Sequence, residues 1–339
     1  MTQIHKPRIG ITLGDVNGIG PEVVLKALSD SRLLSIITPV VYGSAKVISF
    51  YKKLVGIDEL NYTQVRNKGQ LVLKSINVIN CWEDHLEILP GKPSAQAGKA
   101  SMVALKMACD DLKEGIIDAL VTGPIDKHSI HSDEFPFKGH TEYLTQFFGV
   151  TDSLMFMVSD TLRIGLVTEH LAIKDVANAI TKERIESKLK IMEQSLRKDF
   201  NISKPRIALL GLNPHAGDNG LIGLEDEQII KPIVADQRNK GKLIYGPFPA
   251  DGFFATGTYS KYDGILAMYH DQGLIPFKTI AFEEGINFTA GLPYVRTSPD
   301  HGTAYAIAGK NQASESSLRV AVYRAADIFR SRNEPSAEK

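Results

Sequence analysis

Short apolar runs alternate along the chain with amphipathic stretches that have the spacing of helices. The apolar runs have the length and residue types of buried strands. They cover residues 8–13, 39–42, 76–80, 118–121, 154–158, 163–168, 206–210, 262–268 and 292–295. Alternation of strand and helix favours a parallel sheet with helices on both faces. The pattern therefore predicts an α/β fold with a mostly parallel central sheet.

Residues typical of helix ends support this pattern at several places. Ser44 is expected to cap a helix that Gly56 closes, and Ser94 to cap another that ends near Gly115. The acidic stretch 225–227 suits the first turn of a further helix, where carboxylates complement the helix dipole. No linker rich in proline or serine separates two domains. We therefore expect any second lobe to be inserted, with the chain crossing between lobes.

Composition narrows the class of protein. The 339 residues are 43% hydrophobic and 23% charged, and 39 basic side chains balance 39 acidic ones. This balance gives no overall field for nucleic acid or an acidic membrane. The two cysteines, Cys81 and Cys109, match no zinc or redox spacing and are expected to be reduced thiols. The chain shows neither a signal peptide nor a membrane-length apolar run, so we expect a cytoplasmic protein.

Three of the nine histidines occupy comparable places. His170, His215 and His270 each follow a predicted strand, at the carboxyl edge of a parallel sheet where ligands bind. Three neutral imidazoles can hold a divalent metal and leave a coordination position open for a substrate. Because their separations match no local ligand motif, each histidine could equally well cap a strand end.

Two glycine-containing segments are candidates for anion binding. The loop 14–22 joins the first strand to a helix, and Pro21 suits the first helical position. Its glycine spacing is not that of the dinucleotide motif, so ordinary turn chemistry remains an alternative. The segment Gly139-His-Thr-Glu142 opens another helix. His140 and Thr141 there would suit a phosphate, although a simple helix cap is also possible.

The last third of the chain contains further polar candidates. Lys278 and Arg296, with Asn287 between them, could hold a carboxylate or phosphate, although a single surface charge is usually only solvated. The segment Asp300-His-Gly-Thr-Ala304 precedes an alanine-rich, helix-like run that ends at Lys310. Its small residues would let a flat group lie close to the backbone, or would allow close helix packing.

Together these motifs resemble the 4-hydroxythreonine-4-phosphate dehydrogenase family, in the same order from residue 9 to about residue 328. The most specific matches are Leu212-Asn-Pro-His-Ala-Gly217, Tyr269-His-Asp-Gln-Gly273, Gly139-His-Thr-Glu142, Gly246-Pro-Phe-Pro-Ala-Asp251 and Gly291-Leu-Pro-Tyr-Val-Arg-Thr-Ser298. One departure is Val16-Asn17, where the family usually has Pro-Ala. The departure leaves the contacts of that loop open.

The resemblance implies a fold like that of isopropylmalate dehydrogenase, with two α/β lobes and an active site in the cleft between them. We expect residues 1–125 with 290–330 to form the first lobe and residues 126–289 the second, which also makes dimer contacts. The polar residues 331–339 are expected to form a frayed tail. The family is also expected to act as a homodimer with the active site at the subunit interface.

The resemblance further implies roles for individual residues. His170, His215 and His270 would bind one divalent metal per subunit, zinc or alternatively magnesium or cobalt, shared between subunits. Substrate-binding positions of the family match His140, Thr141, Lys278, Asn287 and Arg296. The segment containing His301, Gly302, Thr303 and Ala304, followed by Ile307-Ala-Gly-Lys310, resembles the adenosine-binding loop of isopropylmalate dehydrogenases. It would bind NAD or NADP.

The reaction implied is oxidation of 4-hydroxythreonine 4-phosphate to a 3-oxo acid, which decarboxylates to 3-amino-2-oxopropyl phosphate in pyridoxine 5'-phosphate biosynthesis. The residues leave the general base open between Lys278, Asp251 and a metal-bound water. A sister dehydrogenase acting on 4-phosphoerythronate would share all of these motifs. A three-histidine metallohydrolase is the alternative from another class. A non-enzymatic protein that binds a phosphorylated ligand is a third possibility, which the histidine triad disfavours.

Overall fold

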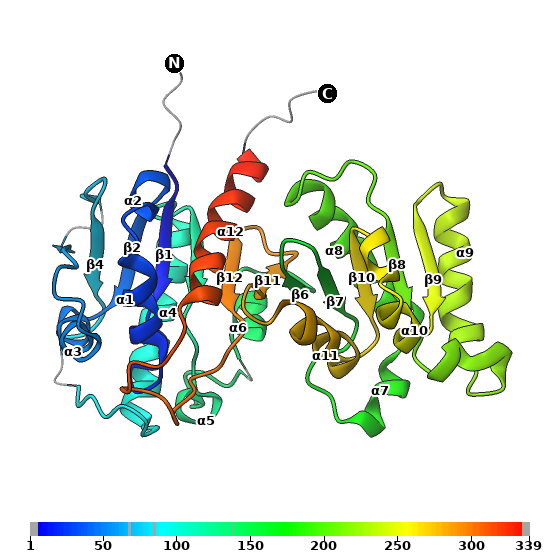
Figure 1. Ribbon diagram of the computed structural model, residues 1–339, viewed down its shortest axis with the longest axis horizontal. Helices are drawn as coiled ribbons and strands as arrows, with labels where there is room; N and C mark the ends of the chain where they lie inside the picture. Colours follow the sequence, from blue (N-terminus) through cyan, green and yellow to red (C-terminus); the bar gives the residue numbers. More distant parts are fainter. Residues whose placement is uncertain (1–5, 67–68, 84–85, 138, 334–339) are drawn as a thin grey trace, which may run out of the picture. The chain divides into compact units, whose positions relative to one another are not determined.

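The computed structural model describes residues 6–66, 69–83, 86–137 and 139–333 (Figure 1). Contacts within the chain form two compact units. The first contains the chain up to Phe148 and Pro293–Arg330, and the second contains Gly149–Leu292 and continues from Ser331. No helix in the described ranges has both the length and the apolar character needed to cross a membrane.

The first unit contains a fully parallel set of strands in the order β3-β4-β2-β1-β5-β12. The strands are β1 (Arg8–Thr12), β2 (Thr38–Gly43), β3 (Tyr62–Val65), β4 (Ile76–Asn80), β5 (Ala119–Thr122) and β12 (Val295–Pro299). The helices are α1 (Gly20–Leu28), α2 (Leu33–Ile36), α3 (Ala45–Val55), α4 (Ala95–Lys113), α5 (Lys127–Ile130), α6 (His140–Phe147) and α12 (Ser316–Asn333). On β12, Thr297 donates a hydrogen bond to the carbonyl of Ala321 in α12, so α12 covers one face of that strand.

The second unit has the strand order β11-β6-β7-β10-β8-β9. β6 is antiparallel to β11 and β7, whereas the other pairs are parallel. The strands are β6 (Leu154–Val158), β7 (Arg163–Leu166), β8 (Ile207–Leu210), β9 (Ile244–Phe248), β10 (Gly264–Ala267) and β11 (Ile286–Ala290). The helices are α7 (Ile173–Ala179), α8 (Lys182–Lys198), α9 (Lys231–Asn239), α10 (Ala250–Ala255) and α11 (His270–Ala281), with the short turns η1 (Pro214–Gly220), η2 (Asp226–Ile230) and η3 (Thr258–Lys261).

Helices α8 and α11 cover opposite faces of β7 and β10 (Figure 1). Gly165 of β7 lies against Met192 of α8, whereas its neighbours Ile164 and Leu166 lie against Gly273 of α11. Alternate residues of a strand point to opposite faces, so this contact pattern places one helix on each side. The predicted α/β fold with a mostly parallel sheet, covered on both faces, is confirmed for these strands.

The predicted helix ends are also confirmed. Ser44 accepts a hydrogen bond from the amide of Lys46 at the start of α3, and Gly56 ends that helix in the left-handed conformation. Ser94 accepts from the amide of Ala97 at the start of α4, which ends at Lys113, just before Gly115. Both are ordinary capping arrangements that satisfy amides at the helix start.

The strand predictions miss the sheet edges and misplace one strand. β3 and β9 are edge strands with mainly half-buried residues, so their sequences lack a continuous apolar run. β11 was also missed because Asn287 and Thr289 interrupt its apolar residues. The predicted strand 292–295 was wrong in position, since a turn at Gly291, with a φ of 91°, delays β12 until Val295.

The two contact units differ from the predicted lobes in where the chain crosses between them. α5 and α6 were expected in the second lobe, but their contacts place them in the first unit. α5 packs against α4, where Gly98 lets the backbone of Ser129 approach closely. Ser331 to Asn333 belong to α12, and the rest of the predicted tail lies outside the described residues. The division into two catalytic lobes stays a prediction.

Candidate active site

The three predicted metal ligands follow three neighbouring strands of the second unit. β10 pairs in parallel with β7 on one side and with β8 on the other. His170 comes after β7, His270 comes after β10 and opens α11, and His215 comes after β8 in η1. Because the carboxyl ends of parallel strands share one edge of a sheet, the fold brings all three histidines to that edge.

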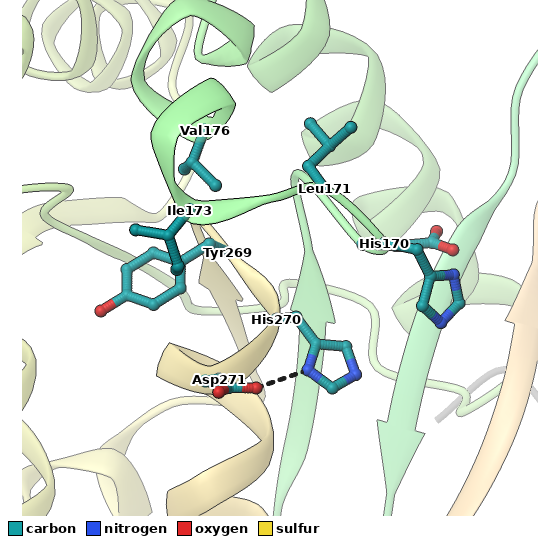
Figure 2. Close-up of a pocket in the computed structure, with 8 residues that line it drawn as sticks. His170, Leu171, Ile173, Val176, Tyr269, His270 and Asp271 are labelled. Atoms are coloured by element: carbon teal, nitrogen blue, oxygen red, sulfur yellow. Dashed lines mark hydrogen bonds and ion pairs between the residues drawn. The ribbon is translucent and has the colours of Figure 1, made fainter.

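His170 and His270 lie side by side (Figure 2). Their ring centroids are 5.8 Å apart. Nδ1 of His270 lies 2.7 Å from a carboxylate oxygen of Asp271. An ionised carboxylate only accepts, so Nδ1 donates in this contact, and in a neutral ring Nε2 keeps its lone pair for a ligand. The two histidines, with Glu169 and Asp271 beside them, line a cavity of about 250 Å³ that also has an apolar wall. That wall includes Leu171, Ile173 and Val176.

His215 lies on an unusual stretch of backbone. All five residues from His215 to Asn219 have positive φ angles, between 42° and 80°, and only Gly217 among them is a glycine. L-residues rarely adopt this left-handed conformation in succession, because each one costs about 1–2 kcal/mol. Asp226, which is fully buried, holds the start of the turn by accepting hydrogen bonds from the amides of Leu212 and Asn213. The backbone at His215 is thus fixed by contacts rather than by local preference.

The structure therefore brings two of the three predicted ligands together within one chain. In the described ranges, no three His, Cys, Asp or Glu side chains are grouped as a metal site would require. A site shared between two subunits, as the family resemblance implies, does not require all three rings to meet in one chain. The metal assignment stays a prediction.

Arg296 is the most deeply buried of the predicted substrate residues. It lies on β12 with 2% of its surface exposed. Its Nε and one terminal nitrogen donate to Oγ1 of Thr122 on β5, at 3.1 and 2.5 Å. Burial lowers the pKa of Arg296 to about 10, so the guanidinium stays charged at neutral pH. A buried cation of this kind favours an anionic ligand.

His140 begins α6 near Arg296. Burial, and then the positive charges of Arg296 and Lys127, lower the pKa of His140 well below its usual value. Its ring is therefore neutral at pH 7, and its Nε2 is buried without a hydrogen-bond partner. The N-cap of α6 is Gly139, which has no side chain to cap the helix, and Thr141 is the second helical residue. The unpartnered ring nitrogen of His140, the start of α6 and the two cations together fit a bound phosphate or carboxylate.

The other predicted substrate and catalytic residues belong to the second unit. Lys278 is partly buried in the last turn of α11. Asn287 lies on β11, and its Oδ1 is buried without a hydrogen-bond partner, which leaves an acceptor for a ligand. Asp251 is exposed in the first turn of α10, the helix that packs beside η1 and hence near the turn of His215. Their roles stay predictions.

The predicted cofactor loop packs on the first glycine loop. The amide of Ile19 donates to the carbonyl of Thr303 at 2.9 Å, and the hydroxyl of Tyr305 donates to Asp15 at 2.9 Å. Gly18 lies so close to Thr303 that a Cβ atom would not fit. Gly302 and Ala304 are exposed, and His301 is partly exposed. The loop is thus held by contacts with the loop 14–22, and its other residues are accessible to solvent. Its cofactor contacts stay a prediction.

Two expectations for these loops change. Amides of the loop 14–22 already have protein partners, since Asp15 donates to Pro124, Asn17 to the Asp15 carboxylate and Ile19 to Thr303. The structure thus favours turn chemistry over anion binding there.

The prediction of a helix-like run that ends at Lys310 was wrong. This segment forms turns, with positive φ angles at residues 304, 309 and 311.

Asn17, one of the two residues at which this chain departs from the usual family motif, has a structural role. It is fully buried, accepts from the amide of Leu89 at 2.8 Å and donates to the carbonyl of Lys92 at 2.9 Å. This side chain therefore fixes the segment that precedes α4. The sequence analysis missed this contact because Asn17 and Leu89 are far apart in the chain.

The mostly parallel sheet, with polar residues at the carboxyl ends of its strands, defines an α/β protein whose ligand site is expected at those strand ends. Residues 35–325 match the family described as pyridoxal phosphate biosynthetic protein PdxA, and the chain belongs to that family. The predicted family is therefore confirmed.

Relatives and solved structures agree with this assignment. The chain is 49% identical to a 4-hydroxythreonine-4-phosphate dehydrogenase of Bacteroides thetaiotaomicron, over 99% of this chain and 92% of that protein. It resembles the crystal structure of a 4-hydroxythreonine-4-phosphate dehydrogenase from Klebsiella pneumoniae with a TM-score of 0.81, 33% identity, and coverage of 97% and 99%. A terephthalate 1,2-cis-dihydrodiol dehydrogenase from Burkholderia xenovorans is more distant, with a TM-score of 0.63, 27% identity, and coverage of 96% and 98%.

Proposed function

We propose that this protein is a 4-hydroxythreonine-4-phosphate dehydrogenase that transfers hydride to NAD or NADP. It oxidises the substrate hydroxyl to a ketone, and the resulting 3-oxo acid loses carbon dioxide to give 3-amino-2-oxopropyl phosphate. The observation that carries this proposal is the buried cationic site around Arg296 and His140, in a chain that shares this family's sequence. Such a site suits a substrate with a phosphate and a carboxylate.

The substrate is held by charge and by directed hydrogen bonds. Arg296 contributes a charged donor, and His140 and Thr141 contribute polar groups at the start of α6. Lys278 and Asn287 are proposed to bind the remaining polar groups of the substrate. Fixing the charged ends in this way orients the reacting carbon, and orientation lowers the barrier of a hydride transfer. Decarboxylation then follows because the adjacent carbonyl accepts the electron pair of the breaking bond.

His170, His215 and His270 are the residues proposed to hold a divalent metal. The fit is supported by the paired rings of His170 and His270, and by the Asp271 carboxylate that leaves Nε2 of His270 available. When bound, such a metal lowers the pKa of an alcohol and stabilises developing negative charge on its oxygen. Zinc suits imidazole ligands best, and magnesium or cobalt are the alternatives.

The hydroxyl proton needs an acceptor among the residues of this chain. Lys278 and Asp251 are the proposed candidates, because both are ionisable and neither is fully buried. A bound nicotinamide would accept the hydride from the carbon. The residue that acts as base takes the hydroxyl proton, so the substrate gives up one hydride and one proton in total. His301, Gly302, Thr303 and Ala304 are proposed to bind the adenosine end of the cofactor.

We also propose a homodimer with a composite site. Large apolar side chains are exposed in the second unit: Ile275 and Phe282 on or just after α11, at 63% and 74%, and Leu221 after η1, at 82%. Exposed apolar side chains of this size favour burial against a partner. A two-fold dimer would bury the same surface on both copies and create two equivalent sites.

Mixing two inactive variants tests the composite site. Because His170 and His270 lie side by side in one chain, His215 is the ligand expected from the other subunit. His215→Ala and His270→Ala should each be inactive, but mixing them under conditions of subunit exchange should restore activity. If the two ligands come from different chains, each heterodimer has one intact site and one doubly altered site. Activity should therefore reach up to half of the wild-type value per heterodimer. Mass spectrometry first confirms that the subunits have exchanged. If activity still does not recover, both ligands come from one chain.

The proposed reaction is tested by following the absorbance of reduced nicotinamide. We expect absorbance to rise with 4-hydroxythreonine 4-phosphate and NAD or NADP, and to rise far less with the dephosphorylated compound. Faster turnover of 4-phosphoerythronate would favour the sister dehydrogenase. Turnover of a cis-dihydrodiol would instead indicate a function like that of the Burkholderia xenovorans protein. Release of inorganic phosphate without reduced nicotinamide would support the metallohydrolase alternative.

A further inference from the structure

The three histidine-bearing strand ends are joined through the backbone of one residue, Met268. This residue comes directly after β10, and regular pairing of β10 with β7 and β8 ends just before it. The amide of Met268 donates to Oε1 of Gln272 at 2.7 Å. Its carbonyl accepts from Oγ1 of Thr168 at 2.7 Å and from the Thr168 amide at 3.2 Å. Both polar groups of Met268 are therefore fixed.

The same two side chains extend to the neighbouring strand ends. Thr168 follows β7 and lies two residues before His170. Nε2 of Gln272 donates to the carbonyl of Gly211 at 2.6 Å, and Gly211 follows β8, four residues before His215. Gln272 itself lies two residues after His270, in the first turn of α11. The side-chain amide of Gln272 thus connects the end of β10 to the end of β8. At this point the two strands no longer pair through backbone hydrogen bonds.

We propose that Thr168 and Gln272 are positioning residues that set the spacing of His170, His215 and His270. This inference rests on the proposed metal site. Both amide atoms of Gln272, and the hydroxyl of Thr168, are engaged by backbone groups, so these side chains act through the histidines rather than on the substrate. A metal tolerates little error in ligand position, so loosening this connection weakens binding even when the fold is intact.

Two substitutions remove the connecting bonds while keeping the side-chain shape. Thr168→Val loses the hydroxyl, and Gln272→Met loses both amide bonds. Thr168→Ser keeps the hydroxyl and should restore wild-type behaviour. Thr297→Val is the matched control, because Thr297 is also buried and also donates to a backbone carbonyl, that of Ala321, at 2.9 Å.

The measurement is the affinity of the metal-free proteins for Co²⁺, by competition with a chromophoric chelator. The absorption spectrum of the bound ion is recorded as well. We expect Thr168→Val and Gln272→Met to bind Co²⁺ about 10- to 100-fold more weakly, with an altered spectrum. Thr168→Ser and Thr297→Val should match the wild type in both. Metal-free Thr168→Val and Thr297→Val should show similar decreases in melting temperature, because each loses one buried hydrogen bond.

Wild-type affinity and spectrum in both Thr168→Val and Gln272→Met would overturn the inference while leaving the proposed metal site intact. Equal weakening in the Thr297→Val control would also overturn it, since the effect would then be general destabilisation. If the wild-type protein binds no Co²⁺, the metal site itself fails and the inference fails with it. The nicotinamide assay on the same preparations shows separately whether dehydrogenase activity stands.

Discussion

Replacing His215 by alanine is expected to remove most of the bound divalent metal and nearly all dehydrogenase activity. An ion that stabilises a developing alkoxide contributes several kcal/mol to the reaction, so turnover should fall at least about 1,000-fold. The imidazole of His215 is exposed, so the substitution should not disturb the core. Metal content of the purified variant by mass spectrometry and turnover in the nicotinamide assay are the two measurements.

A second histidine serves as the control for this result. His131 is exposed at the end of α5 in the first unit, and His131→Ala should keep both metal and activity. Full metal occupancy with normal turnover in folded His215→Ala would show that His215 is not a ligand. Loss of activity with full metal occupancy would instead assign His215 a role in the reaction other than holding the ion.

Replacing Arg296 by methionine is expected to lower kcat/KM without lowering the free energy of unfolding. Charge-assisted hydrogen bonds to a phosphate or carboxylate contribute about 3 kcal/mol in total, so kcat/KM should fall at least about 100-fold. The lowered pKa of Arg296 shows that burial disfavours its charge. An apolar side chain there should therefore leave the free energy of unfolding unchanged or raise it. Chemical denaturation and steady-state kinetics measure the two quantities.

The control for this second prediction is Arg319→Met. Arg319 of α12 forms a partly exposed ion pair with Glu315, which directly precedes that helix, and its replacement should affect neither quantity by much. A near-normal kcat/KM in Arg296→Met would remove Arg296 from the substrate site. The dephosphorylated substrate identifies which anion Arg296 binds. If it binds the phosphate, the substitution and the loss of phosphate should have effects that do not add.

The sequence predicted the central strands well, for a physical reason. Strands such as β1, β7 and β10 are covered on both faces, so their residues are apolar in a continuous run. The edge strands β3 and β9 are only half covered. Thr63 and Gln64 in β3, and Gly246 and Pro247 in β9, make both look like loop sequence. Their positions are decided by pairing with a neighbour, which is a long-range contact that local patterns do not contain.

The candidate site was predictable to the extent that it depends on strand ends. His170 and His270 were expected at one edge because parallel strands end together, and they lie side by side there. The connections through Thr168 and Gln272 were not predicted, because neither residue has a sequence signal beyond the family motif. Burial of Arg296 was equally hidden, since sequence alone treats a single arginine as a surface charge. Only the fold places it beside Thr122 and His140.

The left-handed turn at His215 has a consequence for how the protein would exchange an ion. Residues 215–219 keep their conformation through Asp226, which lies thirteen positions after Asn213 and belongs to a different turn. Once that contact opens, the segment should leave its native conformation, because L-residues disfavour the left-handed region. Opening of this turn would then be a small, local unfolding event that costs less than unfolding the unit. Release of an ion held by His215 would follow the rate of that event, and not the strength of the metal–nitrogen bond alone.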